Sequence, residues 1–288
     1  MSAPQTAFPA LARPARAASR SLAPTQRLDI GFIAGLAIAA AAGIAGIAAT
    51  GVGPGYFLQP AGAVIVLGGT LGVILLTTPV SSLLNTARRV RELFAAQPVD
   101  REALIGQIIS YAQKVRRKTL LHLEPEIRHA GTGFLAEAML LAIDVKNRAE
   151  LQAALETELR MRERHGEADA RVLEVAGGFA PTLGILGTVV GLVDVLRQFS
   201  NLQSVGYGIG MAFVSTLYGL GLANLLLLPA AHRIRARSIE RIEIQEIVAE
   251  GVLCIYDQMH PFLIRQRLNS FLRQEERDAL PPRTALAP

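Results

Sequence analysis

The sequence predicts an all-α integral membrane protein with four transmembrane helices, a large helical cytoplasmic domain between the second and third of them, and a cytoplasmic C-terminal helix. The prediction rests on four long apolar segments, a mean hydropathy of +0.34, and charged residues that gather between those segments. The expected spans are residues 30–50, 62–80, 175–196 and 208–231. Each has about 20 residues, enough to cross a hydrocarbon core of about 30 Å at 1.5 Å per residue.

Lysine and arginine residues predict the orientation of these spans. One of the 29, Arg197, lies between the third and fourth spans, and the other 28 precede the first span, follow the fourth, or lie between the second and third. Cytoplasmic loops carry an excess of these residues, so both termini are expected in the cytoplasm. The first span is too long for a signal-peptide core and is closely followed by another, so we expect it in the mature chain.

The same pattern divides the chain into five regions. Residues 1–27, rich in Ala, Pro and Arg, predict a disordered cytoplasmic extension, and residues 28–80 predict a transmembrane hairpin. Residues 81–174 predict a cytoplasmic helical domain, residues 175–231 a second transmembrane hairpin, and residues 232–288 a cytoplasmic helical tail. The uncharged segment TGVGPGYFLQP predicts a tight external turn within the first hairpin.

The first span carries a row of small residues. Gly31, Gly35, Ala39 and Gly43 follow one another at four-residue spacing. This spacing places them on one face, where helix backbones can approach closely. We therefore expect that face to pack against another helix.

Apolar residues recur at helical spacing directly after the second span. Leu83, Leu84, Ala87, Val90 and Phe94 predict an amphipathic helix whose apolar face is buried.

Further helices are predicted along the rest of the chain. Asp100 is the expected N-cap of a helix that carries Leu104, Ile108 and Tyr111, and Pro125 interrupts the following connection. Two long patterns continue without a breaker, from about residue 149 into the third span and from the fourth span into the tail. Such helices can transmit a shift or rotation rigidly, or can simply hold a domain against the membrane.

No catalytic or metal-binding motif is visible, so an enzyme is not expected. Cys254 is the only cysteine and is expected to pack as a small apolar residue. His122 and His129 lie seven residues apart and predict a solvated surface pair rather than a metal site. Basic residues alternate with acidic ones and no recognition fold is apparent, so nucleic acid is not an expected partner.

The third and fourth spans carry Gly, Ser, Thr and Pro but no ionisable residue near either centre. Thr188 and Thr216 place hydroxyls at membrane depth without the cost of a buried charge. The pattern suits the wall of an ion path whose carboxylate belongs to another chain. The alternative is that each hydroxyl bonds to the preceding turn of its own helix. Asp194 lies near the end of the third span and is expected to pair with Arg197 at the interface rather than to carry ions.

From about residue 28 to residue 272 the chain resembles the MotA/PomA family of flagellar stator subunits, its PomA-like branch in particular. FLQPAGAVIVLGGT, FAPTLGILGTVVGLV and GIGMAFVSTLYGLGLANLLLLPAAHRI carry the resemblance. It implies a homo-oligomer of five subunits in the lipid of the bacterial inner membrane, around two single-span MotB-like or PomB-like chains that each bring an essential aspartate. Passage of H⁺ or Na⁺ is expected to turn the ring against the rotor protein FliG, with no cofactor beyond the transported ion.

The resemblance assigns roles to residues of the spans. Thr188 and Thr216 match threonines that face the ion path, and Ser215 adds a hydroxyl that suits either Na⁺ coordination or a proton-conducting water path. The ion identity stays open, with H⁺ favoured only as the more frequent choice. Pro181 and Pro229 match prolines associated with conformational change, although a helix kink or end is the simpler explanation.

The segment YAQKVRRKTLLHLEPEI matches the family segment whose charges face the rotor. The match places Arg116, Arg117 and Glu124 at rotor-contact positions; a solvated charged face is the alternative. The chain departs from the family pattern at RRK, at Pro125, and at Asp194, where a small apolar residue is expected. These departures leave the rotor contact and the external mouth open.

Two other functions compete with this interpretation. A TolQ/ExbB-like subunit would transduce ion energy without rotation, but such chains typically have three spans, and residues 30–80 here bring the number to four. A passive membrane scaffold would use the same threonines and prolines only for packing.

Overall fold

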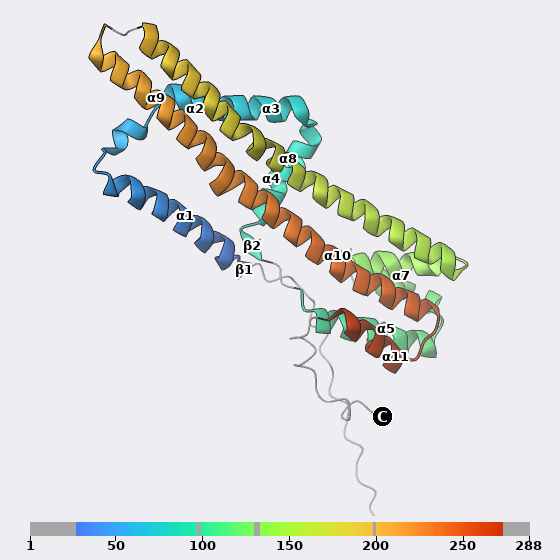
Figure 1. Cartoon of the computed structure of the whole chain (residues 1–288). Coiled ribbons are helices and arrows are strands. Elements are labelled where there is room, and N and C mark those ends of the chain that lie inside the picture. The colour runs from blue at the N-terminus through green and yellow to red at the C-terminus, as the bar shows by residue number, and fades with distance from the viewer. Residues whose placement is uncertain (1–26, 97–98, 130–132, 198–199, 273–288) are drawn as a thin grey trace, which may run out of the picture.

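The computed structural model describes residues 27–96, 99–129, 133–197 and 200–272. Within them the regular secondary structure is helical except for one antiparallel pairing of two-residue strands, β1 (Arg27–Leu28) and β2 (Ala95–Ala96). The predicted disordered extension lies outside the described residues except for its last position. Long helices run side by side along most of the molecule (Figure 1).

Four helical segments of the described chain are long and apolar enough to cross a membrane, which confirms the predicted number of spans. The first is α1 (Ile30–Ala49), and the third is the apolar half of α8 (Arg148–Arg197). The second contains η1 (Pro54–Phe57), α2 (Pro60–Ala63), the π-helix η2 (Val64–Gly68) and α3 (Gly69–Thr77). The fourth runs through α9 (Leu202–Gly221), the π-helix η4 (Leu222–Leu227) and the start of α10 (Leu228–Tyr256).

The second span ends earlier than residue 80, where the sequence placed its end. Helix α3 stops at Thr77, Thr78 is extended, and Pro79 precedes α4 (Val80–Glu92). The pyrrolidine ring of a proline disfavours helical backbone in the residue before it, so Pro79 separates the span from α4.

The two predicted long helices are confirmed. Helix α8 is continuous over 50 residues, about 75 Å at 1.5 Å per residue. Helices α9 and α10 continue into one another through η4 and lie along α8 (Figure 1). The wide turn of η4 ends at Leu227, two residues before Pro229, which has no N–H to donate. A π-turn there lets the helix pass the proline without ending.

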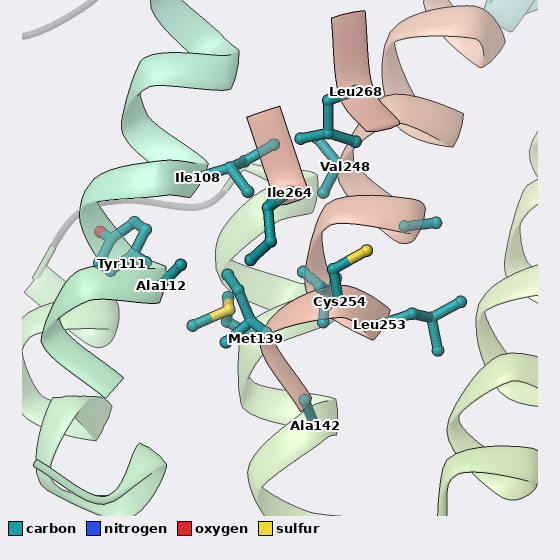
Figure 2. Packing of buried hydrophobic residues seen from close by; sticks show 14 of the residues in the cluster. Ile108, Tyr111, Ala112, Met139, Ala142, Val248, Leu253, Cys254, Ile264 and Leu268 are labelled. Carbon is teal, nitrogen blue, oxygen red and sulfur yellow. The ribbon is translucent and has the colours of Figure 1, made fainter. Parts of the chain in front are cut away.

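The far ends of α8 and α10 pack into a domain, called here the helical domain. It also contains α5 (Arg101–Arg117), η3 (Leu120–Leu123), α6 (Glu124–His129), α7 (Phe134–Asp144), α11 (Pro261–Leu268) and η5 (Asn269–Phe271). Its core joins these helices, and Figure 2 shows residues from α5, α7, α10 and α11 meeting in it. The domain lies at the opposite end of the long helices from the turn between α8 and α9 (Figure 1).

Several predictions for the helical domain are confirmed. Leu104, Ile108 and Tyr111 are buried, and the Asp100 carboxylate accepts a hydrogen bond from the Ala103 N–H at 3.0 Å, as an N-cap does. Cys254 is buried in the core, and this burial raises the pKa of its thiol to about 11. It therefore packs as a neutral, small apolar group.

The predicted apolar faces of two other helices are not buried as expected. Leu84 of α4 is 67% exposed, and α4 instead buries Thr86, whose hydroxyl donates to the Asp169 carbonyl of α8 at 3.3 Å. No residue of α1 is buried, and a Cβ on Gly35 or Gly43 would meet nothing within 4 Å. The small-residue face of α1 is thus not used for packing within this chain.

A buried carboxylate ties the start of α1 to α10. Asp29 caps α1 by accepting from the Phe32 N–H at 3.2 Å. Its other oxygen accepts from Arg233 at 2.5 Å and from Arg237 at 2.8 Å, both on α10. These pairs fix the start of the first span to the helix that continues the fourth.

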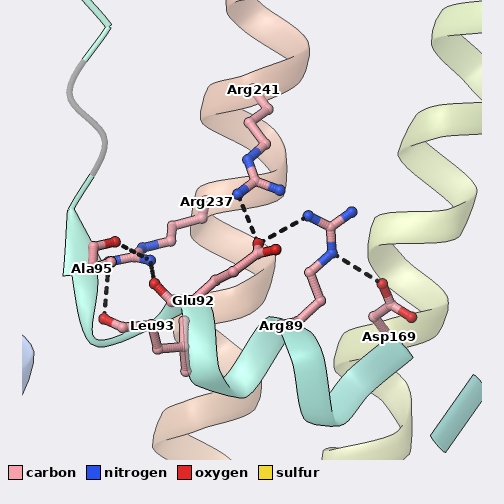
Figure 3. Close-up of polar contacts among 7 residues, drawn as sticks. All are labelled: Arg89, Glu92, Leu93, Ala95, Asp169, Arg237 and Arg241. Carbon is pink, nitrogen blue, oxygen red and sulfur yellow. Dashed lines mark hydrogen bonds and ion pairs between the residues drawn. The ribbon is translucent and has the colours of Figure 1, made fainter. Parts of the chain in front are cut away.

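Arg237 also holds the end of α4. Its guanidinium donates to the carbonyl oxygens of Glu92 at 2.5 Å, Leu93 at 3.0 Å and Ala95 at 3.0 Å (Figure 3). The last carbonyls of a helix have no partner within the helix, and a cation there also opposes the negative end of its dipole. Asp29, Arg233 and Arg237 thereby join α1, α4 and α10 in what we call the junction.

We predict that Asp29→Asn destabilises the protein in a pH-dependent way. Hydrogen bonds from Arg233 and Arg237 lower the pKa of Asp29 from 3.8 to about 2, against the raising effect of burial. A lowered pKa stabilises the fold above the unfolded-state value, and this stabilisation is lost as the pH falls through the folded value. The melting temperature of the variant should lie below that of the wild type at neutral pH, and the difference should shrink as the pH falls from about 5 towards 2.

Asp100→Asn is the matched control, because Asp100 also caps a helix but its carboxylate has no arginine partner in the described chain. A melting difference for Asp29→Asn that stayed constant over the same pH range would show that the charge of Asp29 does not contribute.

Candidate functional site

Thr188 and Thr216 meet between the third and fourth spans. Their hydroxyl oxygens lie 2.6 Å apart, and both residues are half-buried. The Thr188 oxygen also lies 3.1 Å from the carbonyl oxygen of Gly184 on its own helix and 3.1 Å from that of Ala212 on α9. The pair therefore bonds across the two helices as well as to its own.

The number of hydroxyl protons determines which threonine donates and which accepts in the bond between them. Thr188 has one hydroxyl proton, and two carbonyl oxygens that can only accept lie within reach of it. If Thr188 donates to either carbonyl, Thr216 must be the donor in the bond between the hydroxyls. Thr216 then keeps its lone pairs free to accept from water or to coordinate a cation.

A seam of small residues brings the two helices this close. Ala180, Gly184, Gly187 and Gly191 of α8 face Gly208, Ala212, Ser215 and Gly219 of α9. A Cβ on Gly191 would lie 2.8 Å from the Gly208 carbonyl oxygen, and one on Gly219 would lie 2.6 Å from that of Ala180. Both distances are too short for a real side chain, so the backbones touch only because these positions are glycine.

The seam has the same spacing on both helices, four, three and then four residues. A repeat of seven residues keeps one face of each helix against its neighbour over several turns, at a crossing angle of about 20°. Thr188 and Thr216 each follow a seam residue by one position, and they lie at one edge of the contact.

Ser215 lies inside the seam rather than at its edge. It has no exposed surface, and its hydroxyl donates to the Met211 carbonyl of its own helix at 2.7 Å. A Cβ on Gly187 would come within 2.8 Å of the Ser215 oxygen, and Gly62 of the second span is also too close to carry a side chain there. Ser215 therefore packs three spans together. Its contribution to an ion path stays a prediction, which this burial does not favour.

The two prolines have different surroundings. Pro181 lies inside α8 without ending it, one turn before Gly184 of the seam and next to Gly219 of α9. Pro229 lies in the first turn of α10, directly after η4. Each marks a place where the ladder of backbone hydrogen bonds lacks a donor. Their roles in conformational change stay predictions.

The predicted rotor-contact residues lie around η3. Arg116 and Arg117 are exposed in the last turn of α5 and have no ion pair within the described chain. Glu124 starts α6 and accepts from Arg128, one turn later, at 2.8 Å. The structure thus places two unpaired cations and one paired carboxylate near one surface segment.

Asp194 lies in the last turns of α8, far from the centre of the third span, and its predicted pairing with Arg197 stays a prediction. His122 and His129 each bond within their own turn, to Thr119 at 2.7 Å and to the Pro125 carbonyl at 2.6 Å. No group of three or more metal-ligand side chains occurs among the described residues.

The junction was missed from the sequence. Asp29 immediately precedes an uncharged helix, and Arg233 and Arg237 follow the fourth span at four-residue spacing. This pattern of an N-cap acid and two arginines on one helix face was a usable signal, but the sequence does not say that the two segments meet. The seam had a clearer signal in its repeated spacing.

Comparisons with known proteins agree with the geometry. Residues 126–247 match the MotA/TolQ/ExbB proton channel family. Motility protein A of Treponema phagedenis is 30% identical over 87% of this chain and 95% of its own length. Motility protein A of Bacillus subtilis is 29% identical, over 87% and 93%. Chemotaxis protein PomA of Vibrio alginolyticus is 26% identical, over 77% and 87%. These similar identities leave the PomA-like branch a prediction.

Two solved structures share the fold. The C. jejuni MotAB structure superimposes with a TM-score of 0.80 at 25% identity, and covers 86% of this chain and 97% of the compared chain. The flagellar MotAB stator complex of Bacillus subtilis gives a TM-score of 0.78 at 29% identity, with 85% and 96% covered. With four spans, an uncharged hydroxyl pair between the last two, and relatives matched over nearly their whole length, this chain belongs to the MotA/PomA family of flagellar motor stator subunits.

Proposed function

We propose that this chain forms, with further copies of itself, the ring that couples H⁺ or Na⁺ flow across the bacterial inner membrane to torque on the rotor protein FliG. A MotB-like single-span partner supplies the ion-binding carboxylate. In this proposal the ring has five subunits, and the two termini and the helical domain of each subunit lie in the cytoplasm. The proposal is supported by the names of the relatives and by the two MotAB structures.

The observation that carries the proposal is the hydroxyl pair on an apolar surface. Thr188 and Thr216 are flanked one turn away by Leu192, Leu220 and Phe213, which are all exposed. Lipid alone gives the free lone pairs of Thr216 no partner. A neighbouring helix with a carboxylate would complete the site, because a cation could pass between its charge and these oxygens.

Within the third span, α8 has no carboxylate at the depth of Thr188. Its Asp194 follows Thr188 by six residues, which is about 9 Å along the helix. The chain can therefore provide oxygen ligands but not the group that releases and rebinds a proton. This division of chemistry between two chains is the reason we assign the ion-binding charge to the partner.

The long helices give a route from the hydroxyl pair to the rotor. Helix α8 carries Thr188 at one end and enters the core of the helical domain at the other, where Leu151 and Leu155 are buried. A rotation of α8 at membrane depth moves this domain as well, because a continuous helix is stiff along its length. One charge that crosses 100 mV releases about 2.3 kcal/mol, which suits a small step rather than refolding.

The two competing functions have less support. A TolQ/ExbB-like role without rotation does not account for the first hairpin, which brings the candidate spans to four. A passive scaffold explains the glycine seam but not a hydroxyl pair at its exposed edge. The experiments below separate all three.

Co-expression with a MotB-like partner tests ion conduction directly. The partner is truncated to remove the segment that plugs its channel, and cytoplasmic acidification is recorded with an intracellular pH indicator, first with and then without external Na⁺. The proposal expects flux that disappears when the partner's aspartate is replaced by asparagine. Flux that persists in that variant would transfer ion binding to this chain and contradict the proposal.

We predict that Thr216→Val slows ion flux about tenfold, which corresponds to roughly 1.4 kcal/mol on the barrier. Valine keeps the shape of the side chain but removes the Thr216 hydroxyl and its bond to Thr188. Thr182→Val is the matched control, because the Thr182 hydroxyl bonds to the Phe179 carbonyl of its own helix at 2.7 Å. Asp194→Asn should also leave flux nearly unchanged. A larger effect for Asp194→Asn than for Thr216→Val would identify Asp194 as the ion carrier.

Charge reversal at the rotor-contact positions should separate torque from conduction. Arg116→Glu and Glu124→Lys are expected to reduce swimming speed by half or more while flux through the unplugged complex stays at the wild-type level. Arg164→Glu is the control, since Arg164 is exposed on α8 and unpaired in the described chain. Normal swimming in both test variants would remove these residues from the contact.

A further inference from the structure

Two adjoining cavities lie between α4 and the long helices α8 and α10, beside the end of the second span. Their volumes are about 280 Å³ and about 430 Å³, and Arg89, Glu92 and His165 line both. We call the combined hollow the arginine cleft. Its basic residues are Arg88, Arg89, Arg162, Arg237, Arg241 and His165.

Four of the five arginines of the arginine cleft are ion-paired, two of them with carboxylates outside its lining. Arg162 pairs with Glu137 and Glu158 at 2.6 Å each, and Arg237 pairs with Asp29 at 2.8 Å. The two carboxylates of the cleft, Glu92 and Asp169, are already neutralised by Arg89 at 3.2 Å and 3.4 Å, and Glu92 also by Arg241 at 3.1 Å (Figure 3). Each guanidinium carries five N–H donors, and these pairs use only some of them. The cleft therefore keeps guanidinium donors that these pairs do not use, and Arg88 has no ion pair within the described chain.

One wall of the cleft has donors with no partner at all. The side chains of Ser82, Asn85, Arg88 and His165 make no hydrogen bond or ion pair within the described part of the chain. A hydroxyl, an amide, a guanidinium and an imidazole are groups that donate to phosphate oxygens. Their position against Arg89 makes this wall suited to a phosphate group.

The surface beside that wall is apolar towards the membrane. Val80, Leu84 and Arg88 follow one another at four-residue spacing and share one face of α4. Val80 is 61% exposed and Leu84 67% exposed. From the end of the second span outward, this face is thus first apolar and then cationic, which is the order of acyl chain and headgroup in a phospholipid. A free anion would make no use of the apolar part.

We propose that the arginine cleft binds the phosphate group of an anionic phospholipid, with the acyl chain along Val80 and Leu84. Basic pockets between membrane helices are suited to such headgroups. The bound phosphate would bridge α4 and α8 next to the junction, and it would hold α4 at the membrane surface. The proposal concerns a lipid site and does not depend on the ion coupling proposed above.

The test compares three ligands on the full chain purified with its MotB-like partner in a mild detergent. Native mass spectrometry measures binding of dioctanoyl phosphatidylglycerol, dioctanoyl phosphatidylcholine and inorganic phosphate. We expect the phosphatidylglycerol to bind at least tenfold more tightly than either of the others. Arg88→Gln should weaken it about fivefold, the usual effect of one arginine near an anionic lipid.

Arg91→Gln is the matched control, because Arg91 is exposed on the same helix, lines neither cavity and has no ion pair in the described chain. Its affinity should change less than twofold. Leu84→Asn supplies a second variant that should weaken phosphatidylglycerol binding without affecting inorganic phosphate. Circular dichroism melting confirms that each variant is folded before its affinity is compared.

Three results would overturn the proposal. Equal losses for Arg88→Gln and Arg91→Gln would show diffuse attraction rather than a site. Inorganic phosphate that binds as tightly as phosphatidylglycerol would assign the cleft to a soluble anion. If Arg88→Gln lost the oligomer and the wild type showed no lipid selectivity, the arginine cleft would instead be a contact surface for a neighbouring subunit.

Discussion

The close contact between α8 and α9 is the constraint on which the candidate site depends. Backbone atoms of the two helices touch at Gly191 and Gly219, where no side chain fits. Only at this separation can Thr188 reach a carbonyl oxygen of the opposite helix and the hydroxyl of Thr216. The seam consists of uncharged residues, so it costs little to place in lipid. The polar groups of this contact are the hydroxyls of Thr188 and Thr216 at the edge of the seam.

Much of the fold could be predicted because hydropathy and helical periodicity are local properties of a sequence. The four spans, the two unbroken long helices and the Asp100 cap follow from such patterns. The apolar face of α4 could not be assigned in this way, because which face is buried depends on where α8 lies. Thr86 is buried there through a bond to α8, while Leu84 stays exposed.

The candidate site shows the same limit. The resemblance selected Thr188 and Thr216, and the structure brings them together, whereas it places the neighbouring Ser215 within the packing of three spans. Adjacent residues of a helix point about 100° apart, so one of the two hydroxyls must leave the edge that the other occupies. The junction of Asp29 with Arg237 depends on contacts between residues 208 positions apart, which no local pattern reveals.

The two π-helices mark the positions where a change in backbone conformation of the spans costs the least free energy. Elements η2 and η4 lie within the second and fourth spans, and both contact α8. A π-turn leaves a local mismatch in the hydrogen-bond ladder, and Pro229 removes a further donor two residues after the end of η4. On the side of the helical domain, by contrast, Arg237 fixes α10 to the ends of α1 and α4 through four oxygen acceptors. A strain that arises at Thr216 is therefore relieved by a change at η4 before the junction breaks.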